Sequence, residues 1–275
     1  MPSATTRTTA ALLLALVALC AGATVLCGAS TGLVIGLGGV VVLNGAAYWC
    51  SDRLVCALTR AQPLRPNDAP RLHALVADLA GRAGMPVPRI AVIDAPAPDA
   101  LYTGRDPAHA VILVTAGLLP CLDARAARGV LAHEMAHIRG WDTLLGTVAM
   151  TLAVASAVVA VVEQITALVG HPDADTLAQH LGAPLAAQLL QRAVSRTREY
   201  AADSGSARLN GDALALTDAL TLLARAWPPP RSGQRGERVR RLFHTHPPLA
   251  ARIARLRASH PGAPPQCGVP SMPIL

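Results

Sequence analysis

A long stretch without charge near the start of the chain constrains its fold more than any other feature. No charged residue occurs from Thr8 to Ser51, which is about twice the ~20 residues that one membrane-spanning helix requires. Because "GASTG" at 28–32 interrupts the stretch, the sequence predicts two spans, about Ala10–Cys27 and Gly32–Trp49. A cleaved signal peptide is the alternative for the first span, but the second span that follows at once argues against it.

The composition favours a membrane protein over a nucleic-acid-binding one. Only 15% of residues are charged, and the mean hydropathy of +0.39 is too high for an ordinary soluble domain. The net charge of +7 comes from arginines, since the chain has no lysine. These arginines are scattered and lack interleaved aromatic residues, so a basic face against an anionic lipid bilayer explains them better than nucleic acid. The six cysteines show no CxxC or CxxxH spacing, which disfavours a cysteine zinc site.

The segment after these spans has the pattern of a small sheet with helices. Residues 67–85 have the periodicity of an amphipathic helix that opens at a capping-type Asn67 and stops at Gly84. A β-type run follows at 88–96, and two more occur in "DALYTG" and "HAVILVTAGLL". A small sheet therefore precedes the next helix, for which Asp123 is the candidate N-cap.

The helix that starts near Asp123 carries the pattern of a metal site. His133 and His137, at i and i+4, project from one face, and zinc readily accepts imidazole nitrogens. Glu134, one of only four glutamates, is rotated by about 100° from His133. It can therefore stand beside a metal without binding it and accept a proton from an attacking water. Two histidines that merely decorate a helix are the alternative, and two histidines alone leave zinc short of a protein ligand.

The segment "SRTREYAAD" at 195–203 offers the missing ligand. Glu199 and Asp203 are again one turn apart on a predicted helix. Glu199 can bind the metal while Asp203 accepts a hydrogen bond from a ligand histidine and fixes its tautomer. A solvent-exposed, ion-paired helix face is the alternative. This alternative is disfavoured because two of the four glutamates, Glu134 and Glu199, fall in motifs that complete each other.

Four segments of the chain together resemble one family of membrane enzymes. They are "LYTGRDPAHAVILVTAGLL" (101–119), "HEMAHIRGWD" (133–142), "SRTREYAAD" (195–203) and "HTHPPLAARIARL" (244–256). With the N-terminal hairpin, they resemble the HtpX-like membrane zinc metallopeptidases, relatives of the CAAX prenyl proteases. The resemblance implies a mainly α membrane protein with a small β-sheet, in which transmembrane helices join a zincin-like metalloprotease domain. Asp99, where relatives usually carry asparagine, and "GW" at 140–141 depart from the family's pattern.

The same resemblance implies a role for each residue of the two motifs. It gives one zinc ion per chain, with His133, His137 and Glu199 as its ligands. It makes Glu134 the general base and places Asp203 behind a ligand histidine. His246, which precedes two prolines at a helix start, is a candidate for contact with the substrate or a developing oxyanion. A helix cap or a surface histidine is the alternative for His246.

One strand is a candidate for substrate binding. We predict that it lies at an edge of the sheet and pairs with an extended substrate backbone, which would allow many sequences to be cut. A core strand is the alternative. The strand consists of Ala110, Val111, Ile112, Leu113, Val114 and Thr115.

The metal site also constrains the membrane topology. Thr143–Val162 carries no charge and is a third candidate span, whereas the candidate fourth span at 175–194 is polar. Because His133 and Glu199 must meet at one ion, both segments cross the membrane or neither does. We predict that both cross, with the polar side chains turned toward neighbouring helices and the active site on the cytoplasmic side of the inner membrane, where the arginines gather. The predicted segments are an N-terminal hairpin (1–55), a first protease part (56–142), a second hairpin (143–194), a second protease part (195–260) and a mobile proline-rich tail (261–275).

The sequence as a whole predicts a multi-pass membrane zinc endopeptidase that acts on proteins or peptides. Damaged or misassembled membrane proteins are the substrates that the resemblance implies. A site-two-type protease is one alternative, since "LNGDAL" at 209–214 superficially resembles its aspartate motif, but the charged HExxH helix is not itself a span. A regulatory protease with one dedicated signalling substrate and a catalytically inactive scaffold are the others. The oligomeric state is not predicted.

Overall fold

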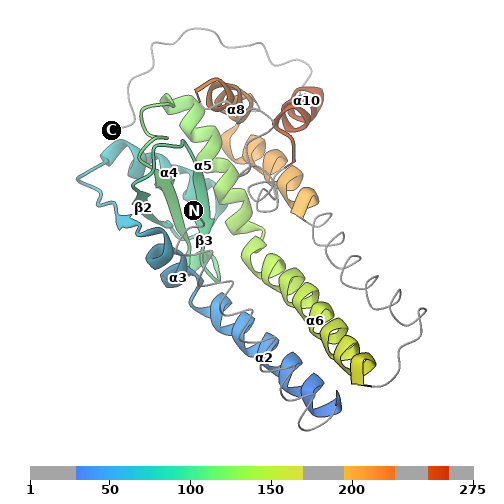
Figure 1. Cartoon of the computed structure of the whole chain (residues 1–275). Helices are drawn as coiled ribbons and strands as arrows, with labels where there is room; N and C mark the ends of the chain where they lie inside the picture. Colours follow the sequence, from blue (N-terminus) through green and yellow to red (C-terminus); the bar gives the residue numbers. More distant parts are fainter. Residues whose placement is uncertain (1–28, 170–194, 213, 227–246, 260–275) are drawn as a thin grey trace. The chain divides into compact units, whose positions relative to one another are not determined.

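The computed structural model describes residues 29–169, 195–212, 214–226 and 247–259 (Figure 1). The chain divides into two compact units, with junctions at 49/50, 143/144 and 194/195. The described residues form mostly helices and one small mixed sheet. This part of the predicted fold class is therefore confirmed.

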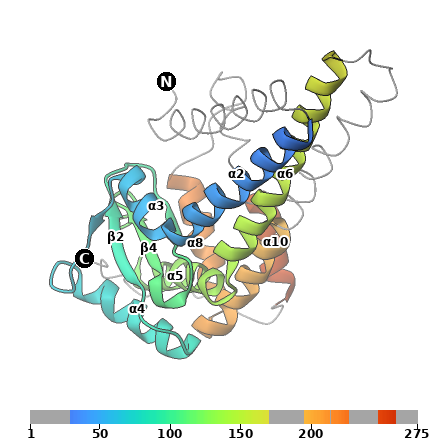
Figure 2. The ribbon, with the colours of Figure 1, turned by 90° about the horizontal axis from the view of Figure 1, so that it is seen from below.

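The first unit contains two long apolar helices, α2 (Ala29–Trp49) and α6 (Asp142–Val169), the second of which begins just before the junction. They cover the second and third predicted spans. Val40 of α2 is fully buried and packs in one cluster with Val158 and Val162 of α6, and Figure 2 shows the two helices alongside each other. The two helices thus bury an apolar seam between them.

The described helices give only limited information on membrane crossing. None of them alone meets the length and hydropathy criteria for a span. A pair broken at Cys50, Val34–Trp49 with Ser51–Thr59, meets them by length and composition. The predicted spans at Ala10–Cys27 and 175–194 lie outside the described residues.

The second unit is built on a four-stranded sheet with the strand order β1-β2-β4-β3. β2 and β4 are parallel, whereas β1 and β3 run antiparallel to their neighbours. The strands are β1 (Gln62–Pro63), β2 (Arg89–Ile93), β3 (Ala100–Thr103) and β4 (Val111–Thr115). The helices of this unit are α3 (Ser51–Thr59), α4 (Pro70–Ala83), α5 (Ala124–Arg139), a helix at 195–210, α8 (Ala215–Ala226) and α10 (Leu249–Ser259), with a 3-10 turn, η1, at Pro107–His109.

β4 is a central strand, so the prediction that Ala110–Thr115 forms an edge for substrate pairing is wrong. Ile112 is flanked by Ile90 of β2 on one side and by Tyr102 of β3 on the other. The backbone of β4 is therefore already paired, and all five of its residues are buried. The edge on this side of the sheet is β3.

The two faces of β4 contact different layers of the second unit. Ile112 and Val114 belong to the main core, which also contains residues of α4, α5, α8 and α10. Val111 and Leu113 belong to a smaller cluster that Val55 and Cys56 of α3 cover. An uninterrupted apolar run is the expected sequence of a strand that is covered on both faces.

Helix α4 is predicted correctly except for its start. Its N-cap is Ala69 rather than Asn67, and Pro70 occupies the first turn, a position where proline's missing N–H costs nothing. Gly84 caps the other end with a left-handed φ of 66°, as a C-terminal glycine typically does. Leu72, Val76 and Leu79 are buried against the core.

Helix α5 is fixed at its first turn. Asp123 caps it by accepting a hydrogen bond from the N–H of Ala126. Arg125 forms ion pairs with Asp212, at 2.6 Å, and with Asp218 of α8. Asp212 also accepts hydrogen bonds from the backbone N–H groups at the start of α8. The aspartate of "LNGDAL" therefore caps a helix and pairs with an arginine, a structural role that removes the reason to compare it with a site-two-type motif.

Two glycines let neighbouring helices approach α5 closely. A Cβ at Gly129 of α5 would lie 2.5 Å from the backbone nitrogen of Leu216 in α8. A Cβ at Gly205 would lie 2.7 Å from the Cβ of Ala136. These contacts hold α8 and the helix 195–210 directly against the helix that carries the HExxH motif.

Candidate metal centre

Helix α5 presents the three residues of the HExxH motif inside the second unit. His133, Glu134 and His137 are all buried. The Nε2 atoms of His133 and His137 lie 3.2 Å apart, and the two rings are nearly perpendicular, at 86°. One helical turn has therefore brought the two nitrogens to the same point, as the i, i+4 spacing predicts.

Glu199 approaches this point from the helix 195–210. Its Oε1 lies 3.4 Å from Nε2 of His137, and its Oε2 lies 3.6 Å from Nε2 of His133. One ligand atom from each of the three residues lies within 4.8 Å of the others. The close packing of Gly205 on Ala136 holds this helix near enough to α5 for the carboxylate to reach both histidines.

The donor set fits a zinc ion. Two imidazole nitrogens and one carboxylate form the protein part of many catalytic zinc sites, which leave a further position open for a reactant. The Nδ1 atom of each histidine faces an aspartate carboxylate. If each Nδ1 carries the proton, each Nε2 keeps its lone pair for a metal. The chemistry of the cluster thus matches the ion that the sequence predicts.

Asp203 lies behind His133, and Arg252 contacts both of these residues. Oδ1 of Asp203 is 3.1 Å from Nδ1 of His133, and Arg252 binds both carboxylate oxygens, at 2.6 and 3.0 Å. Both residues are buried. Burial alone would raise the pKa of Asp203, but hydrogen bonds from His133 and Arg252 outweigh it and hold this pKa below its usual range. The carboxylate is therefore charged and holds the imidazole in one orientation.

Asp142 and Arg198 lie behind His137 in a similar arrangement. Oδ2 of Asp142 is 2.5 Å from Nδ1 of His137, and its Oδ1 is 3.0 Å from Nε of Arg198. Nη2 of Arg198 donates a hydrogen bond to the hydroxyl of Tyr102, whose ring stacks on His137 with the centroids 4.8 Å apart. Burial would lower the pKa of His137, but hydrogen bonds to Asp142 and Glu199 outweigh it and raise this pKa to about 9. The carboxylates of Asp142 and Glu199 thus favour positive charge beside His137.

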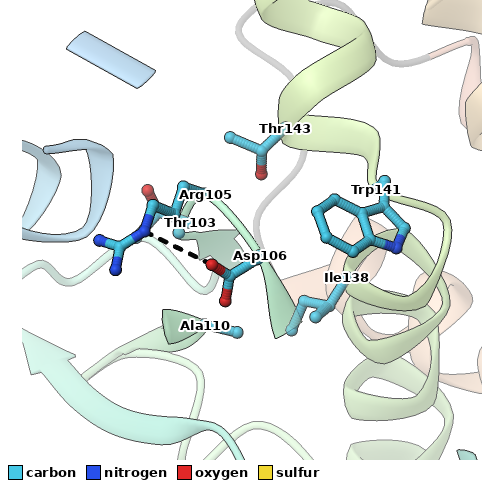
Figure 3. A pocket seen from close by; sticks show the side chains of 8 residues that line it. Thr103, Arg105, Asp106, Ala110, Ile138, Trp141 and Thr143 are labelled. Atoms are coloured by element: carbon cyan, nitrogen blue, oxygen red, sulfur yellow. Dashed lines mark ion pairs between the residues drawn. The ribbon is translucent and has the colours of Figure 1, made fainter. Parts of the chain in front are cut away.

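A small pocket lies between the β3–β4 hairpin and the α5–α6 junction (Figure 3). Its wall includes Ile138, the residue after His137, and Thr103, the residue after Tyr102. Asp106 lines it too, but its carboxylate pairs with Arg105 at 3.4 Å and with the ring of His109. This pocket therefore brings no uncommitted acid to the metal centre.

The comparison with known protein families agrees with this geometry. The sequence profile of peptidase family M48 matches residues 66–260, which include α5 and the helix 195–210. The chain is a member of peptidase family M48. The predicted resemblance is therefore confirmed.

Its relatives within the M48 family align over most of their length. A protease HtpX homolog of Thermococcus kodakarensis is 42% identical over 78% of this chain and 82% of its own length. A protease HtpX homolog from Acidiphilium cryptum is also 42% identical, over 84% of this chain and 88% of its own length. The protease HtpX of Legionella pneumophila is 39% identical over 86% of this chain and 92% of its own length.

A crystal structure of S. mikatae Ste24p has a similar fold. The TM-score is 0.64 at 19% identity, and the match covers 90% of this chain but 62% of the Ste24p chain. At this identity, the comparison supports the fold alone. This M48 chain thus has a fold similar to that of Ste24p.

The predicted site residues fall into three groups in the structure. His133, Glu134, His137, Glu199 and Asp203 lie together in one buried cluster. Ala110–Thr115 forms the central strand β4, and His246 lies outside the described residues. The sequence analysis missed four residues that contact this cluster: Tyr102, Asp142, Arg198 and Arg252.

Each missed residue left at most a weak signal. Asp142 follows His137 by five residues, outside the helical spacing that relates His133 to His137. A left-handed Trp141, with φ at 55°, separates α5 from α6 and turns the chain so that Asp142 lies beside His137. Arg252 is one of three arginines in α10, where an arginine is ordinarily taken to be solvent-exposed. The available signal was the position of Arg252 in the fourth segment of the family resemblance.

Proposed function

We propose that this M48 peptidase is a zinc-dependent endopeptidase that cuts proteins or peptides. The observation that carries the proposal is the convergence of His133, His137 and Glu199 on one buried point, with Glu134 on the same helix. In this proposal His133, His137 and Glu199 hold one zinc ion per chain. When bound, zinc would supply Lewis acidity to the scissile carbonyl.

Glu134 is proposed to be the general base. It follows His133 on α5, so helical geometry rotates it by about 100° from that ligand, and its charge acts on both His137 and Arg252. A carboxylate in this position can accept a proton from the attacking water and carry it to the leaving amide nitrogen. Asp203, which Arg252 holds in place, then keeps His133 in the tautomer that leaves Nε2 unprotonated.

We also propose that the enzyme is an integral protein of the inner membrane with its active site toward the cytoplasm. The exposed apolar side chains of α2, among them Val34, Val41, Val42 and Leu43, support an apolar surrounding. The five predicted segments are kept as the proposed organisation, with hairpins at 1–55 and 143–194, the protease parts at 56–142 and 195–260, and the tail at 261–275. Damaged or misassembled membrane proteins are the proposed substrates.

Two variants of the full chain separate the base from the ligand. Glu134→Gln should keep about one zinc per chain and lose proteolysis of a labelled unfolded protein by roughly 10²–10⁴-fold, since a general base supplies about that factor. Glu199→Ala should lose both zinc and activity. His73→Gln removes a histidine that contacts the carbonyl of Leu64 and should change neither. Zinc binding by Glu199→Ala as tight as that of the wild type would contradict the assigned ligand set.

Proteomics of cells that carry Glu134→Gln then distinguishes two physiological roles. Accumulation of many damaged membrane proteins supports quality control. Accumulation of one protein alone would instead favour a regulatory protease with a dedicated substrate.

A further inference from the structure

The two ligand histidines are supported in a similar way. Behind each Nδ1 lies an aspartate, and each aspartate is paired with an arginine. The pair behind His133, Asp203 and Arg252, contains the aspartate that the sequence predicts. Asp142 and Arg198, the pair behind His137, are not assigned a role by any motif in the sequence.

Asp142 lies between a ligand and a second charged side chain. Its two carboxylate oxygens contact different partners, Nδ1 of His137 at 2.5 Å and Nε of Arg198 at 3.0 Å. The side chain of Asp142 is 9% exposed, and that of Arg198 is 18% exposed. A contact with both oxygens fixes the plane of the carboxylate, and this plane in turn fixes the plane of the imidazole.

Arg198 connects this carboxylate to the third ligand. It directly precedes Glu199 in the helix 195–210, so any restraint on Arg198 also restrains the backbone from which Glu199 projects. The hydrogen bond from Arg198 to Tyr102 adds a contact with β3, and the Tyr102 ring covers one face of His137. The cluster therefore joins α5, the first turn of α6, β3 and the helix 195–210 at one point.

We propose that Asp142 and Arg198 are positioning residues that hold His137 and Glu199 in the geometry for metal binding. The inference rests on the proposed function, in which these two ligands bind zinc. Without Asp142, the His137 ring can rotate and either nitrogen can carry the proton. Without Arg198, the Asp142 carboxylate loses the contact that fixes its plane, and the Glu199 helix loses its links to the first turn of α6 and to β3.

The test measures zinc affinity in the purified full chain by competition with a chromophoric chelator. Asp142→Asn keeps the side-chain shape and removes the charge, and it should weaken zinc binding about 10–100-fold, the usual effect of losing a group behind a ligand. Arg198→Gln should also weaken zinc binding, but by a smaller factor. The double variant should lose less than the sum of the two in free energy, because the residues act as one unit.

The cobalt-substituted protein gives a second readout that does not depend on activity. The visible spectrum of Co²⁺ reports ligand geometry, so a displaced His137 should alter its band positions and intensities in Asp142→Asn. Asp212→Asn is the matched control, since Asp212 is also paired with an arginine but contacts no ligand histidine. It should leave both the zinc affinity and the cobalt spectrum unchanged.

The possible outcomes separate this inference from the proposed function. If the wild-type chain binds no zinc, the proposed function fails before any variant is compared. The inference is wrong, and Asp142 is only structural, if the wild type binds zinc, the zinc affinity of Asp142→Asn is within about twofold of the wild-type affinity, and its cobalt spectrum is unchanged. Should Asp142→Asn fail to fold, Arg198→Gln decides by the same criteria.

Discussion

Removing the charge of Arg252 should destabilise the protein far more than removing that of a surface arginine. Arg252 is 6% exposed and binds both carboxylate oxygens of Asp203, which is 2% exposed. Arg252→Met keeps much of the side-chain volume but leaves this carboxylate charged, buried and with His133 as its remaining hydrogen-bond partner. The perturbation therefore isolates the electrostatic part of the contact.

The size of the effect follows from the burial of the pair. Breaking a buried ion pair by removing one partner costs roughly 3–5 kcal/mol. For a protein of this size, each kcal/mol shifts the melting temperature by about 2–4 °C. Arg252→Met should therefore lower the melting temperature by roughly 6–20 °C.

Thermal unfolding of the wild type and its variants in the same detergent, without added zinc, measures this shift. Arg82→Met is the control, since Arg82 pairs with Asp78 at 3.2 Å where both side chains are about half exposed, and Asp78 also contacts Arg128. It should leave the melting temperature nearly unchanged. The double variant Arg252→Met/Asp203→Leu should recover much of the loss, because it also removes the buried carboxylate that Arg252→Met leaves without its arginine. Equal melting temperatures for Arg252→Met and Arg82→Met would refute the reasoning.

Two further predictions concern acid stability and topology. Burial would raise the pKa of Asp212, but its hydrogen bonds from Arg125 and the backbone hold it below the ordinary value of 3.8. The stability that Asp212 provides is then complete at neutral pH and lost as the pH falls below 3.8. Asp212→Asn should thus have a lower melting temperature than the wild type at pH 7, and the difference should shrink below pH 3.8. A difference in melting temperature that does not change with pH would contradict the ion-pair role. Single cysteines at Pro172 and Ala174, in a background without native cysteines, should be labelled only from outside the cytoplasm if both helices of the second hairpin cross. Labelling only from the cytoplasm would show that the second hairpin does not cross the membrane, so that the protein has two spans.

The residues whose proximity the sequence predicted are those tied together by helical spacing. His133 with His137 and Glu199 with Asp203 are each one turn apart, so their shared direction follows from the helix itself. The start of α5 was also predictable, because Asp123 has the side chain of an N-cap and lies before a periodic segment.

The residues that the analysis missed depend on contacts between elements. Asp142 reaches His137 only because Trp141 adopts a left-handed conformation, and no periodicity predicts such a turn. Arg252 differs from Arg255 and Arg257 in being buried, and the difference arises from the position of α10 against the site. The order of the strands likewise depends on tertiary pairing, although the four apolar residues of Val111–Val114 were evidence for a central strand.

The separation of the ligands along the chain has a consequence for the order of events during synthesis. Glu199 follows His137 by 62 residues, and Arg252 comes 53 residues later still. At a translation rate of about 5–20 residues per second, Glu199 is made roughly 3–12 s after His137. The ribosome therefore exposes the histidines and Glu134 well before the third ligand and the arginine that neutralises Asp203 exist. A nascent chain cannot assemble this centre until Arg252 has been made, so the timing of translation itself delays the onset of proteolysis.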